Sequence, residues 1–298
     1  MAICFRQIYL ETNQGHGIAR RTSLSACTNE LVALMDSDDI SLPTRFEREL
    51  AVFERNPEVS IVGGQIAEFI GDQSNIIGTR IVPEDDKTIK EYMKSRCPMN
   101  QVSVMFRKDF IESVGGYIDW HCEEDYYLWI RSALAGGIFT NVPETLVNVR
   151  VGNEMSARRG GWKYFLSEAK IQKLMLQKRV ISPARFLYNV AVRFGGEVLI
   201  TPSVRTKLFR ILRSKPEEAE YVVPPDSQFE AEKRDHMPFS VSMCVYAGDK
   251  AEWFDAALNS VIYQTIRPDE IVLVVDGPVP DSIRDVIRKY QRICETIG

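Results

Sequence analysis

The sequence Glu30-Leu-Val-Ala-Leu-Met35 runs directly into Asp36-Ser-Asp-Asp39, and this abrupt change indicates the fold class. The apolar run predicts a buried strand, and in open α/β sheets ligands gather at the carboxyl ends of the strands. Three carboxylates packed there repel one another and need a cation. Hard oxygen ligands suit Mg²⁺ or Mn²⁺ on a diphosphate. An acidic turn that caps the next helix explains the same residues, because Asp is common at helix N-caps.

Strand-like and helix-like segments alternate around this stretch, which favours an α/β layer architecture. Strands are predicted over residues 59–64, 102–106, 239–246 and 270–275, and helices over 42–53, 125–134, 252–264 and 282–296. The order strand, helix, strand and Asp276-Gly277 is how a nucleotide-binding α/β domain usually begins. Here that unit stands at the end of the chain, and no second copy of it precedes residue 237.

The composition sets broad limits on function. The chain has 298 residues, 45% of them hydrophobic and 26% charged, which excludes global disorder and allows one or two domains. Lys and Arg total 37 against 41 Asp and Glu, which disfavours a dedicated nucleic-acid-binding protein. Six cysteines without C-x-x-C spacing indicate neither a zinc site nor a disulfide framework, so we expect a cytoplasmic protein. We expect neither a membrane-spanning helix nor a signal peptide.

Glu123-Glu-Asp125 stands at the start of a predicted helix. A carboxylate in the first turn is favoured by the helix dipole and serves there as a cap. The same position suits a general base, because deprotonation of an acceptor hydroxyl needs a carboxylate held on a rigid element. Without further context, the cap is the simpler interpretation.

Two more features indicate a nucleotide site. Asn13-Gln-Gly-His-Gly-Ile-Ala-Arg-Arg21 combines glycines, which let a backbone approach a ligand closely, with arginines that pair with phosphate. A surface loop that enters a basic helix is the alternative. Tyr246 and Asp276 end two predicted strands, where a ring to stack on a base and a carboxylate to accept an imide N–H would form a uracil pocket. Singly, both are ordinary strand-end residues.

The joint arrangement of these segments resembles family 2 glycosyltransferases. The motifs similar to the amino-terminal half of that family are Val-Ser-Met-Cys-Val-Tyr246, Ala257-Leu-Asn-Ser-Val-Ile-Tyr-Gln-Thr265 and Glu270-Ile-Val-Leu-Val-Val-Asp-Gly277. The motifs similar to the rest, in family order, are Asn13-Gln-Gly15, Ala19-Arg20, Leu34-Met-Asp-Ser-Asp-Asp39, Gly115-Gly-Tyr117 and Glu124-Asp-Tyr-Tyr-Leu-Trp-Ile-Arg131. The resemblance covers residues 1 to about 160 and 239–298.

The two blocks stand in the reverse of the family order, so the chain resembles a circular permutant. On this interpretation residues 237–298 are the first, nucleotide-binding part of the catalytic core, and residues 1–160 are its second part. Between them lie a helical accessory segment, 161–215, and an acidic linker, 216–236. A flexible linker of that size reaches ~25 Å, enough to reconnect distant ends of one domain. A slice across tandem transferase domains, or a domain-swapped dimer in which the blocks pair between chains, explains the same order.

The resemblance implies a GT-A fold: a single Rossmann-like α/β domain with a largely parallel central sheet. It implies a metal-dependent, inverting transfer of a sugar from a nucleotide-sugar, most often a UDP-sugar, to a hydroxyl of a saccharide or lipid-linked saccharide acceptor in cell-surface polysaccharide synthesis. By position, the family motifs assign the base to Tyr246 and Asp276, further nucleotide contacts to Arg20 and Asp36, the Mn²⁺ or Mg²⁺ ion to Asp38, the catalytic base to Asp125, and help with acceptor binding to Glu124.

Some positions depart from the family pattern. Val275 stands where a first Asp often precedes the base-reading one, and Gly152 stands where many members carry a His. Arg158-Arg159, just beyond that loop, offers either a diphosphate contact or a solvated basic loop.

The stretch from Lys178 to Lys215 interleaves basic and apolar residues. It suits contact with an anionic membrane surface, which would place the protein peripherally at the inner face of the membrane. An accessory helical pair with a solvated basic face is the alternative. Two other functions remain: a nucleotidyltransferase, for which Ala247-Gly-Asp-Lys250 is a poor triphosphate loop, and a non-catalytic nucleotide-sugar-binding module, which a transfer assay would distinguish.

Overall fold

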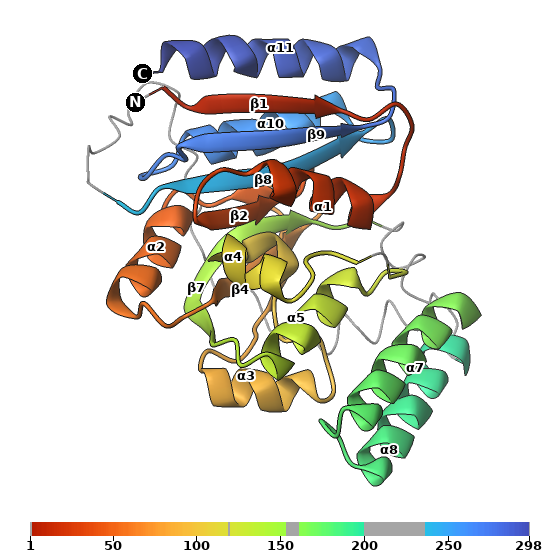
Figure 1. Cartoon of the computed structure of the whole chain (residues 1–298). Helices are drawn as coiled ribbons and strands as arrows, with labels where there is room; N and C mark the ends of the chain where they lie inside the picture. Colours follow the sequence, from red (N-terminus) through yellow and green to blue (C-terminus); the bar gives the residue numbers. More distant parts are fainter. Residues whose placement is uncertain (1, 119, 153–160, 200–235, 298) are drawn as a thin grey trace.

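The computed structural model describes residues 2–118, 120–152, 161–199 and 236–297, which form a sheet covered by helices on both faces (Figure 1). Its strands are β1 (Cys4–Tyr9), β2 (Leu31–Met35), β3 (Ile40–Ser41), β4 (Ile61–Phe69), β5 (Ile76–Arg80), β6 (Met105–Arg107), β7 (Phe139–Arg150), β8 (Phe239–Tyr246) and β9 (Glu270–Asp276). Its α-helices are α1 (His16–Ala26), α2 (Arg45–Arg55), α3 (Asp86–Met93), α4 (Lys108–Ser113), α5 (Glu124–Leu134), α7 (Trp162–Gln177), α8 (Pro183–Arg193), α10 (Ala251–Ile262) and α11 (Asp281–Thr296). The predicted α/β fold is confirmed.

One half of the sheet is parallel and combines strands from both sequence blocks. The strand order is β1-β9-β8-β2-β6-β4-β7-β3, with β5 paired to β4, and the first four strands run parallel. Numbered in the sequence β8, β9, β1, β2, those four strands stand in the order 3-2-1-4 of a dinucleotide-binding sheet. Beyond β2 the sheet is mixed, because β6 is antiparallel to β2 and to β4, whereas β4 and β7 are parallel.

The C-terminal and N-terminal blocks therefore form one sheet within a single chain. Strands β8 and β9 lie between β1 and β2, and helix α11 packs along β1 (Figure 1). The amide of Gln7 donates to the Oε1 atom of Gln291 at 3.2 Å, which joins β1 to α11. Strands of one chain thus complete this half of the sheet, and the domain-swapped dimer stays an alternative.

The strands of the parallel half alternate between two cores. Ile271, Leu273 and Val275 of β9 pack in the core that contains apolar residues of α2, α10 and α11. Val272 faces the other core, which contains residues of α1, α3, α4, α5 and α7. Since both faces of the sheet are covered, these strands are apolar at nearly every position, as expected for buried parallel strands.

Helix α1 crosses β8 and β9 through small polar residues. The Ser242 hydroxyl donates to the Ser23 Oγ at 2.7 Å, and the Ser23 hydroxyl donates to the carbonyl of Val272 at 3.2 Å. All three residues are buried, so these bonds satisfy groups that would otherwise be costly to remove from water. The contact joins the two sequence blocks directly.

Two element predictions need correction. The strand predicted over 102–106 begins only at Met105, because Gln101–Ser103 forms a 3₁₀ turn in which the Ser103 hydroxyl bonds to the carbonyl oxygens of Gly64 and Asn100. The helix predicted from Leu42 begins at Arg45, because Ile40–Ser41 pairs with β7 as the short strand β3. The other predicted strands and helices are present, with ends shifted by a few residues.

Helices α7 and α8 form an antiparallel pair that projects from the lower right of the molecule in Figure 1. They occupy residues 162–193 of the predicted accessory segment, and a π-helical turn, Phe194–Leu199, follows. The remainder of that segment, most of the predicted 216–236 linker and the Arg158-Arg159 pair lie outside the described residues. In the ranges that the structure describes, no helix is long and apolar enough to cross a bilayer.

Candidate functional site

The predicted site residues gather at the carboxyl ends of the neighbouring parallel strands β8 and β2. The strand order reverses here, because β9 and β1 follow on the far side of β8 whereas β2 lies on its other side. In open α/β sheets, ligands bind at this switch point, outside the carboxyl ends of the strands. Asp36 and Ser37 follow β2, and Tyr246 ends β8 beside it. The Ser37 hydroxyl donates to the Oδ2 atom of Asp249 at 2.8 Å, and this bond joins the two strand ends.

Asp276, at the end of β9, holds the glycine-containing loop that precedes α1. Its Oδ1 atom accepts the backbone N–H of Gln14 at 2.7 Å, and its Oδ2 atom accepts that of Gly15 at 3.0 Å. Gly277 has a φ of 86°, and a Cβ there would lie 2.6 Å from the backbone nitrogen of Asn13. The loop therefore passes too close to the strand end for any other residue at 277.

This loop contact was not anticipated from the sequence, which assigns Asp276 to the base of a nucleotide. The two roles are compatible, because each carboxylate oxygen has a second lone pair with which to accept an imide N–H. Asp276 is 5% exposed, so such a ligand would reach it only from the open end of the strands. Base recognition by Asp276 stays a prediction.

Arg20 connects the two halves of the site. Its Nη2 atom donates to the Oδ1 atom of Asp36 at 2.9 Å, and its Nη1 atom donates to the Oε1 atom of Glu124 at 3.0 Å. The Arg20 side chain is only 12% exposed. Burial opposes the charge of Asp36, but Arg20, together with the charges of His16 and Arg45, outweighs it and lowers the pKa of that carboxyl. Burial dominates at Glu124 and raises its pKa, although Arg20 partly offsets this effect.

A group of carboxylates lies around the end of β2. Burial, together with the charges of Asp36 and Asp249, raises the pKa of Asp38 to about 6. Burial and the charges of Asp38 and Asp36 also raise the pKa of Asp39 well above its usual value. The Oδ1 atom of Asp39 accepts the backbone N–H of Arg150 at 2.8 Å, which ties β7 to this end of the sheet. Asp39 is thus occupied structurally, and Asp38 is better placed for a ligand.

These residues fit a cation that binds together with a diphosphate. Burial and the charges of Asp36 and Asp249 raise the pKa of Asp38, and a bound divalent cation would offset these effects. Among the described residues, no three His, Cys, Asp or Glu side chains are arranged to hold an ion by themselves. Ions such as Mg²⁺ commonly take one or two protein carboxylates and complete their shell with water and substrate phosphates. The carboxylate oxygens of Asp38 and the diphosphate oxygens of a nucleotide-sugar would be hard ligands that meet that requirement.

Asp125 lies in the first turn of α5, next to Glu124 in the Arg20 network. Its Oδ1 atom accepts the backbone N–H of Tyr126 at 2.7 Å, and the Cys97 thiol donates to its Oδ2 atom at 3.7 Å. The helix backbone therefore fixes the orientation of this carboxylate. The Gln101 amide donates to the Tyr117 hydroxyl at 2.6 Å. Tyr117 interacts electrostatically with Arg20, Asp125 and Glu124, and burial raises its pKa.

Tyr246 forms a partly open wall at the rim of the site. It is 38% exposed, and its ring meets that of His16 edge-on, with the centroids 6.4 Å apart. Its backbone N–H donates to the Oδ2 atom of Asp249 at 3.1 Å. A Cβ at Gly248 would lie 2.6 Å from the Tyr246 ring, so glycine there leaves the ring its position.

Sequence reasoning missed the contributions of Asp249 and Cys97. Asp249 stands three residues beyond the strand-end residue Tyr246, within the Ala247-Gly-Asp-Lys250 stretch, which the sequence pattern relates only to a triphosphate loop. Its position at a strand end was a usable signal. Cys97 lies 28 residues from Asp125 on a different segment, and no local pattern indicates that the two meet.

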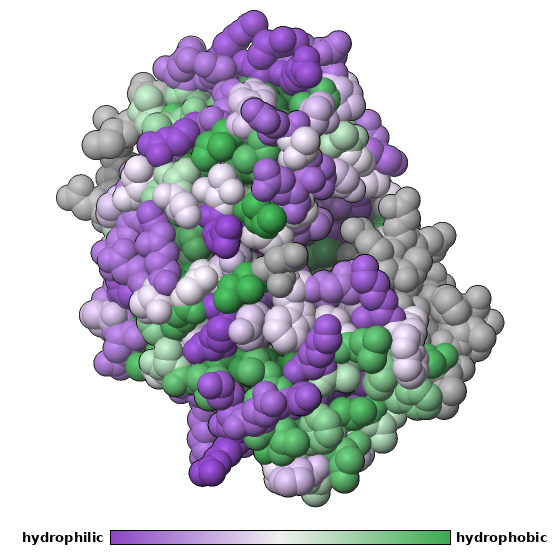
Figure 2. Space-filling view, turned by 45° about the vertical axis from the view of Figure 1, so that its right-hand side comes forward, coloured by the Kyte–Doolittle hydropathy of each residue, from purple (hydrophilic) through white to green (hydrophobic). Residues whose placement is uncertain are grey.

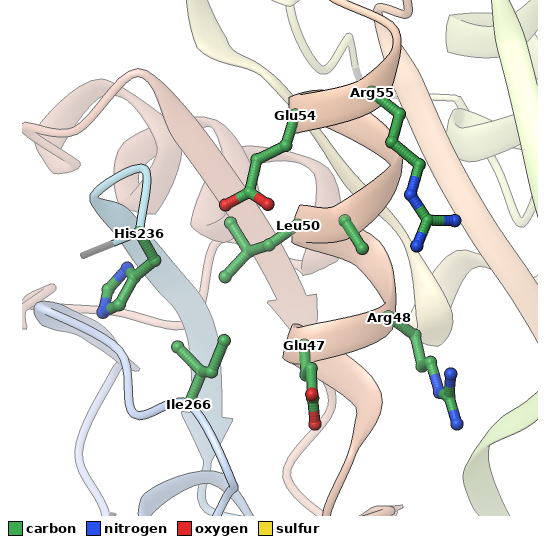
Figure 3. Close-up of a pocket in the computed structure, with 8 residues that line it drawn as sticks. Glu47, Arg48, Leu50, Glu54, Arg55, His236 and Ile266 are labelled. Carbon is green, nitrogen blue, oxygen red and sulfur yellow. The ribbon is translucent and has the colours of Figure 1, made fainter. Parts of the chain in front are cut away.

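A cavity of about 280 Å³ lies elsewhere, against one side of helix α2 (Figure 3). Glu47, Arg48, Glu54 and Arg55 of α2 line it together with His236 and Ile266, which precede β8 and β9. The cavity is therefore at the amino ends of β8 and β9, whereas Tyr246 and Asp276 lie at the carboxyl ends of the same strands. This cavity is separate from the candidate site.

Comparisons with known proteins agree with this arrangement. A sequence model described as glycosyl transferase family 2 matches residues 2–114. An uncharacterized glycosyltransferase of Haemophilus influenzae is 38% identical over 208 residues, which cover 70% of this chain and 77% of the relative. The chain belongs to the family 2 glycosyltransferases.

Two further relatives carry more specific names. The amylovoran biosynthesis glycosyltransferase AmsE of Erwinia amylovora is 38% identical over 167 residues, covering 56% of this chain and 62% of the relative. The UDP-Gal:alpha-D-GlcNAc-diphosphoundecaprenol beta-1,3-galactosyltransferase of Escherichia coli is 37% identical over 195 residues, covering 64% and 70%. Relatives of this chain thus include enzymes named for polysaccharide synthesis and for a lipid-linked acceptor.

Proposed function

We propose that this enzyme transfers a hexose from a UDP-sugar to a hydroxyl of a saccharide carried on a polyprenyl diphosphate. The observation that carries the proposal is the double salt bridge of Arg20, which holds Asp36 on the nucleotide side and Glu124 on the acceptor side of one site. The name of the Escherichia coli relative, which specifies a UDP-sugar and a diphosphoundecaprenol-linked acceptor, supports the substrate classes.

In this proposal, the ends of β8, β9 and β2 bind the nucleotide. Tyr246 stacks on the base from the rim, and Asp276 accepts its imide N–H while still holding the loop at Gly15. Asp36, kept ionised by Arg20, accepts a ribose hydroxyl. Because these groups are fixed by backbone N–H and guanidinium contacts, they need little reorganisation when the donor binds.

A divalent cation, Mn²⁺ or Mg²⁺, held by Asp38 would neutralise charge on the departing nucleoside diphosphate. Asp125 removes the acceptor hydroxyl proton as that oxygen attacks the anomeric carbon from the side opposite the leaving group, which inverts the configuration. Glu124, which Arg20 holds in place, helps to position the acceptor. The role of the chain is mainly positioning and charge neutralisation, since the diphosphate is already a good leaving group.

We also propose that the two sequence blocks represent the family core in permuted order. The order 3-2-1-4, numbered from β8, supports this interpretation. The packing of Ile3 and Cys294 in one hydrophobic core supports it too, because the family order requires α11 to lead into β1.

A transfer assay tests the proposed reaction. The full chain would be incubated with Mn²⁺, a polyprenyl-diphosphate-linked saccharide, and UDP-glucose, UDP-galactose or UDP-N-acetylglucosamine. We expect UDP release that depends on the acceptor, and NMR should show a β-linked product from an α-linked donor. A retained α-configuration, or UDP release that the acceptor does not alter, contradicts the proposal.

A further inference from the structure

Helix α8 carries a row of apolar residues that faces solvent. Leu187 is 67% exposed, Tyr188 65% and Val192 55%, and Ala184 and Ala191 are exposed as well. These five positions follow the i, i+3, i+4, i+7, i+8 spacing that forms one stripe along a helix. We call them the α8 stripe.

The opposite side of α8 holds the helix to the rest of the molecule, through Phe186, which packs against a hydrophobic core, and through hydrogen bonds of Asn189 and Arg193. The Asn189 amide donates to the carbonyl of Lys94 at 2.8 Å and to the Oε1 atom of Gln172 at 2.7 Å. Arg193 forms a salt bridge with Glu168 and donates to the carbonyl of Ser95 at 2.7 Å. These buried and partly buried contacts fix the orientation of α8, so the apolar stripe remains outward in a well-anchored helix.

The apolar surface continues onto the start of helix α7. Trp162 is 58% exposed and Leu166 43%, and the Trp162 ring lies edge-on to that of Phe194, just beyond α8, at 6.2 Å between centroids. Figure 2 shows hydrophobic surface gathered in the lower part of the molecule, where this helical pair lies. Contiguous exposed apolar surface of this kind marks an interaction site more often than an isolated apolar residue does.

The charge of the helical pair indicates the kind of partner. Residues 162–199 contain seven Lys and Arg against two Glu, a net charge of +5, whereas the whole chain carries -4. The remaining residues therefore carry -9. Lys163, Lys170, Lys173 and Lys178 are exposed on or beside α7. A basic, apolar surface on an otherwise acidic protein is complementary to an anionic lipid bilayer, and Trp and Tyr are favoured at the headgroup level.

We propose that the α8 stripe, with Trp162 and Leu166, docks the enzyme on the surface of an anionic membrane. The 11-residue helix lies in the interface plane, with its apolar side chains below the headgroups and the lysines of α7 at the lipid phosphates. The proposal rests on the proposed function in one respect: a polyprenyl-linked acceptor would be presented at that surface.

The docked helices also lie close to the candidate base. Asn189 and Arg193 hold the carbonyls of Lys94 and Ser95, a few residues before Cys97, which contacts Asp125. The Ser167 hydroxyl of α7 donates at 2.6 Å to the carbonyl of His121, in the turn that leads into α5. A bilayer that positions α7 and α8 therefore also positions the acceptor side of the site.

Vesicle co-sedimentation of the full chain, without donor or acceptor, tests the docking surface independently of catalysis. Vesicles would contain phosphatidylcholine alone or mixed with phosphatidylglycerol. We expect binding to the mixed vesicles, weakened by added salt. The double variant Leu187→Gln, Val192→Gln should lower the partition coefficient at least about tenfold, since it removes two anchoring side chains. The double variant Lys170→Gln, Lys173→Gln should weaken binding only to the anionic vesicles.

Ile81→Gln is the matched control, because Ile81 is 52% exposed but lies after β5 and outside the patch. Thermal melting should show that all variants remain folded, as expected for exposed positions. Wild-type protein that binds neither vesicle, or an apolar double variant that binds like Ile81→Gln, overturns the proposal. So does a fall in oligomeric mass of the double variant without vesicles, which would make the stripe an interface between copies. None of these results affects the transfer assay, so the docking and the chemistry fail separately.

Discussion

The parallel half of the sheet and the α7–α8 pair differ in where their apolar residues lie. In the parallel half, strands are apolar on both faces, and polar groups gather only at the carboxyl ends of the strands. In the α7–α8 pair, Ile171 and Phe186 pack inward beside the polar Asn189. Leu187 and Tyr188 of the same pair face solvent. We propose the first region as the site of a small polar ligand and the second as a surface that docks on a membrane. The predictions below test whether the site residues belong to these separate roles.

The largest effect should come from Asp125→Asn, at the acceptor side. Loss of the base should reduce the transfer rate by about 10²- to 10⁴-fold, whereas UDP affinity measured by calorimetry should not change, because the nucleotide site lies on the parallel half. Asp109→Asn, an exposed first-turn residue of α4, is the matched control. If Asp125→Asn also weakened UDP binding to the same degree, Asp125 would be a structural cap.

Asp276→Asn should destabilise the parallel half. The neutral amide has one acceptor oxygen, so it cannot accept the backbone N–H groups of both Gln14 and Gly15 as the two carboxylate oxygens do. Charge-assisted hydrogen bonds of this kind contribute about 1.5–3 kcal/mol to stability. We expect a free energy of unfolding about 2 kcal/mol lower, measured by urea denaturation. Asp285→Asn on the exposed side of α11 should leave it unchanged. Equal stability of both variants would show that the carboxylate does not anchor the loop.

Asp38→Ala should weaken the binding of UDP that depends on Mn²⁺. We expect an affinity lower by about tenfold in the presence of Mn²⁺, and little change in its absence, since only the cation-mediated contact is lost. Calorimetry with and without Mn²⁺ measures both values, and Asp281→Ala, at an 86% exposed side chain, is the control. An unchanged dependence on Mn²⁺ would exclude Asp38 as the ligand.

The smallest effect should come from Tyr246→Ala, at the rim. Loss of a half-exposed stacking surface should lower UDP affinity severalfold, in line with about 0.5–1.5 kcal/mol for an aromatic pair. Tyr246→Phe should retain wild-type affinity, because the ring rather than the hydroxyl makes the contact. If the phenylalanine variant lost as much affinity as the alanine variant, hydrogen bonding by the hydroxyl would replace stacking as the explanation.

Local patterns predicted much of the fold and the residues of the site. The apolar run before Asp36 and the strand that ends in Asp276-Gly277 had the right type and nearly the right ends, because buried parallel strands leave an uninterrupted apolar signal. The strand predicted over 102–106 was partly wrong, because the Ser103 side chain donates a hydrogen bond to the carbonyl of Gly64 and this bond competes with strand pairing. The Arg20 bridge could not be predicted, since its partners lie 16 and 104 residues away.

The sequence alone determined the class of fold, the family and the kinds of side chain at the strand ends, because these follow from local periodicity and short motifs. Only the folded molecule decided that Asp276 anchors the loop before α1, that Arg20 joins Asp36 to Glu124, and that α8 turns its apolar side outward. The physical reason is that periodicity marks an apolar stripe without saying which way it faces. That direction depends on the hydrogen-bond partners of Asn189 and Arg193, which are brought together from distant parts of the chain.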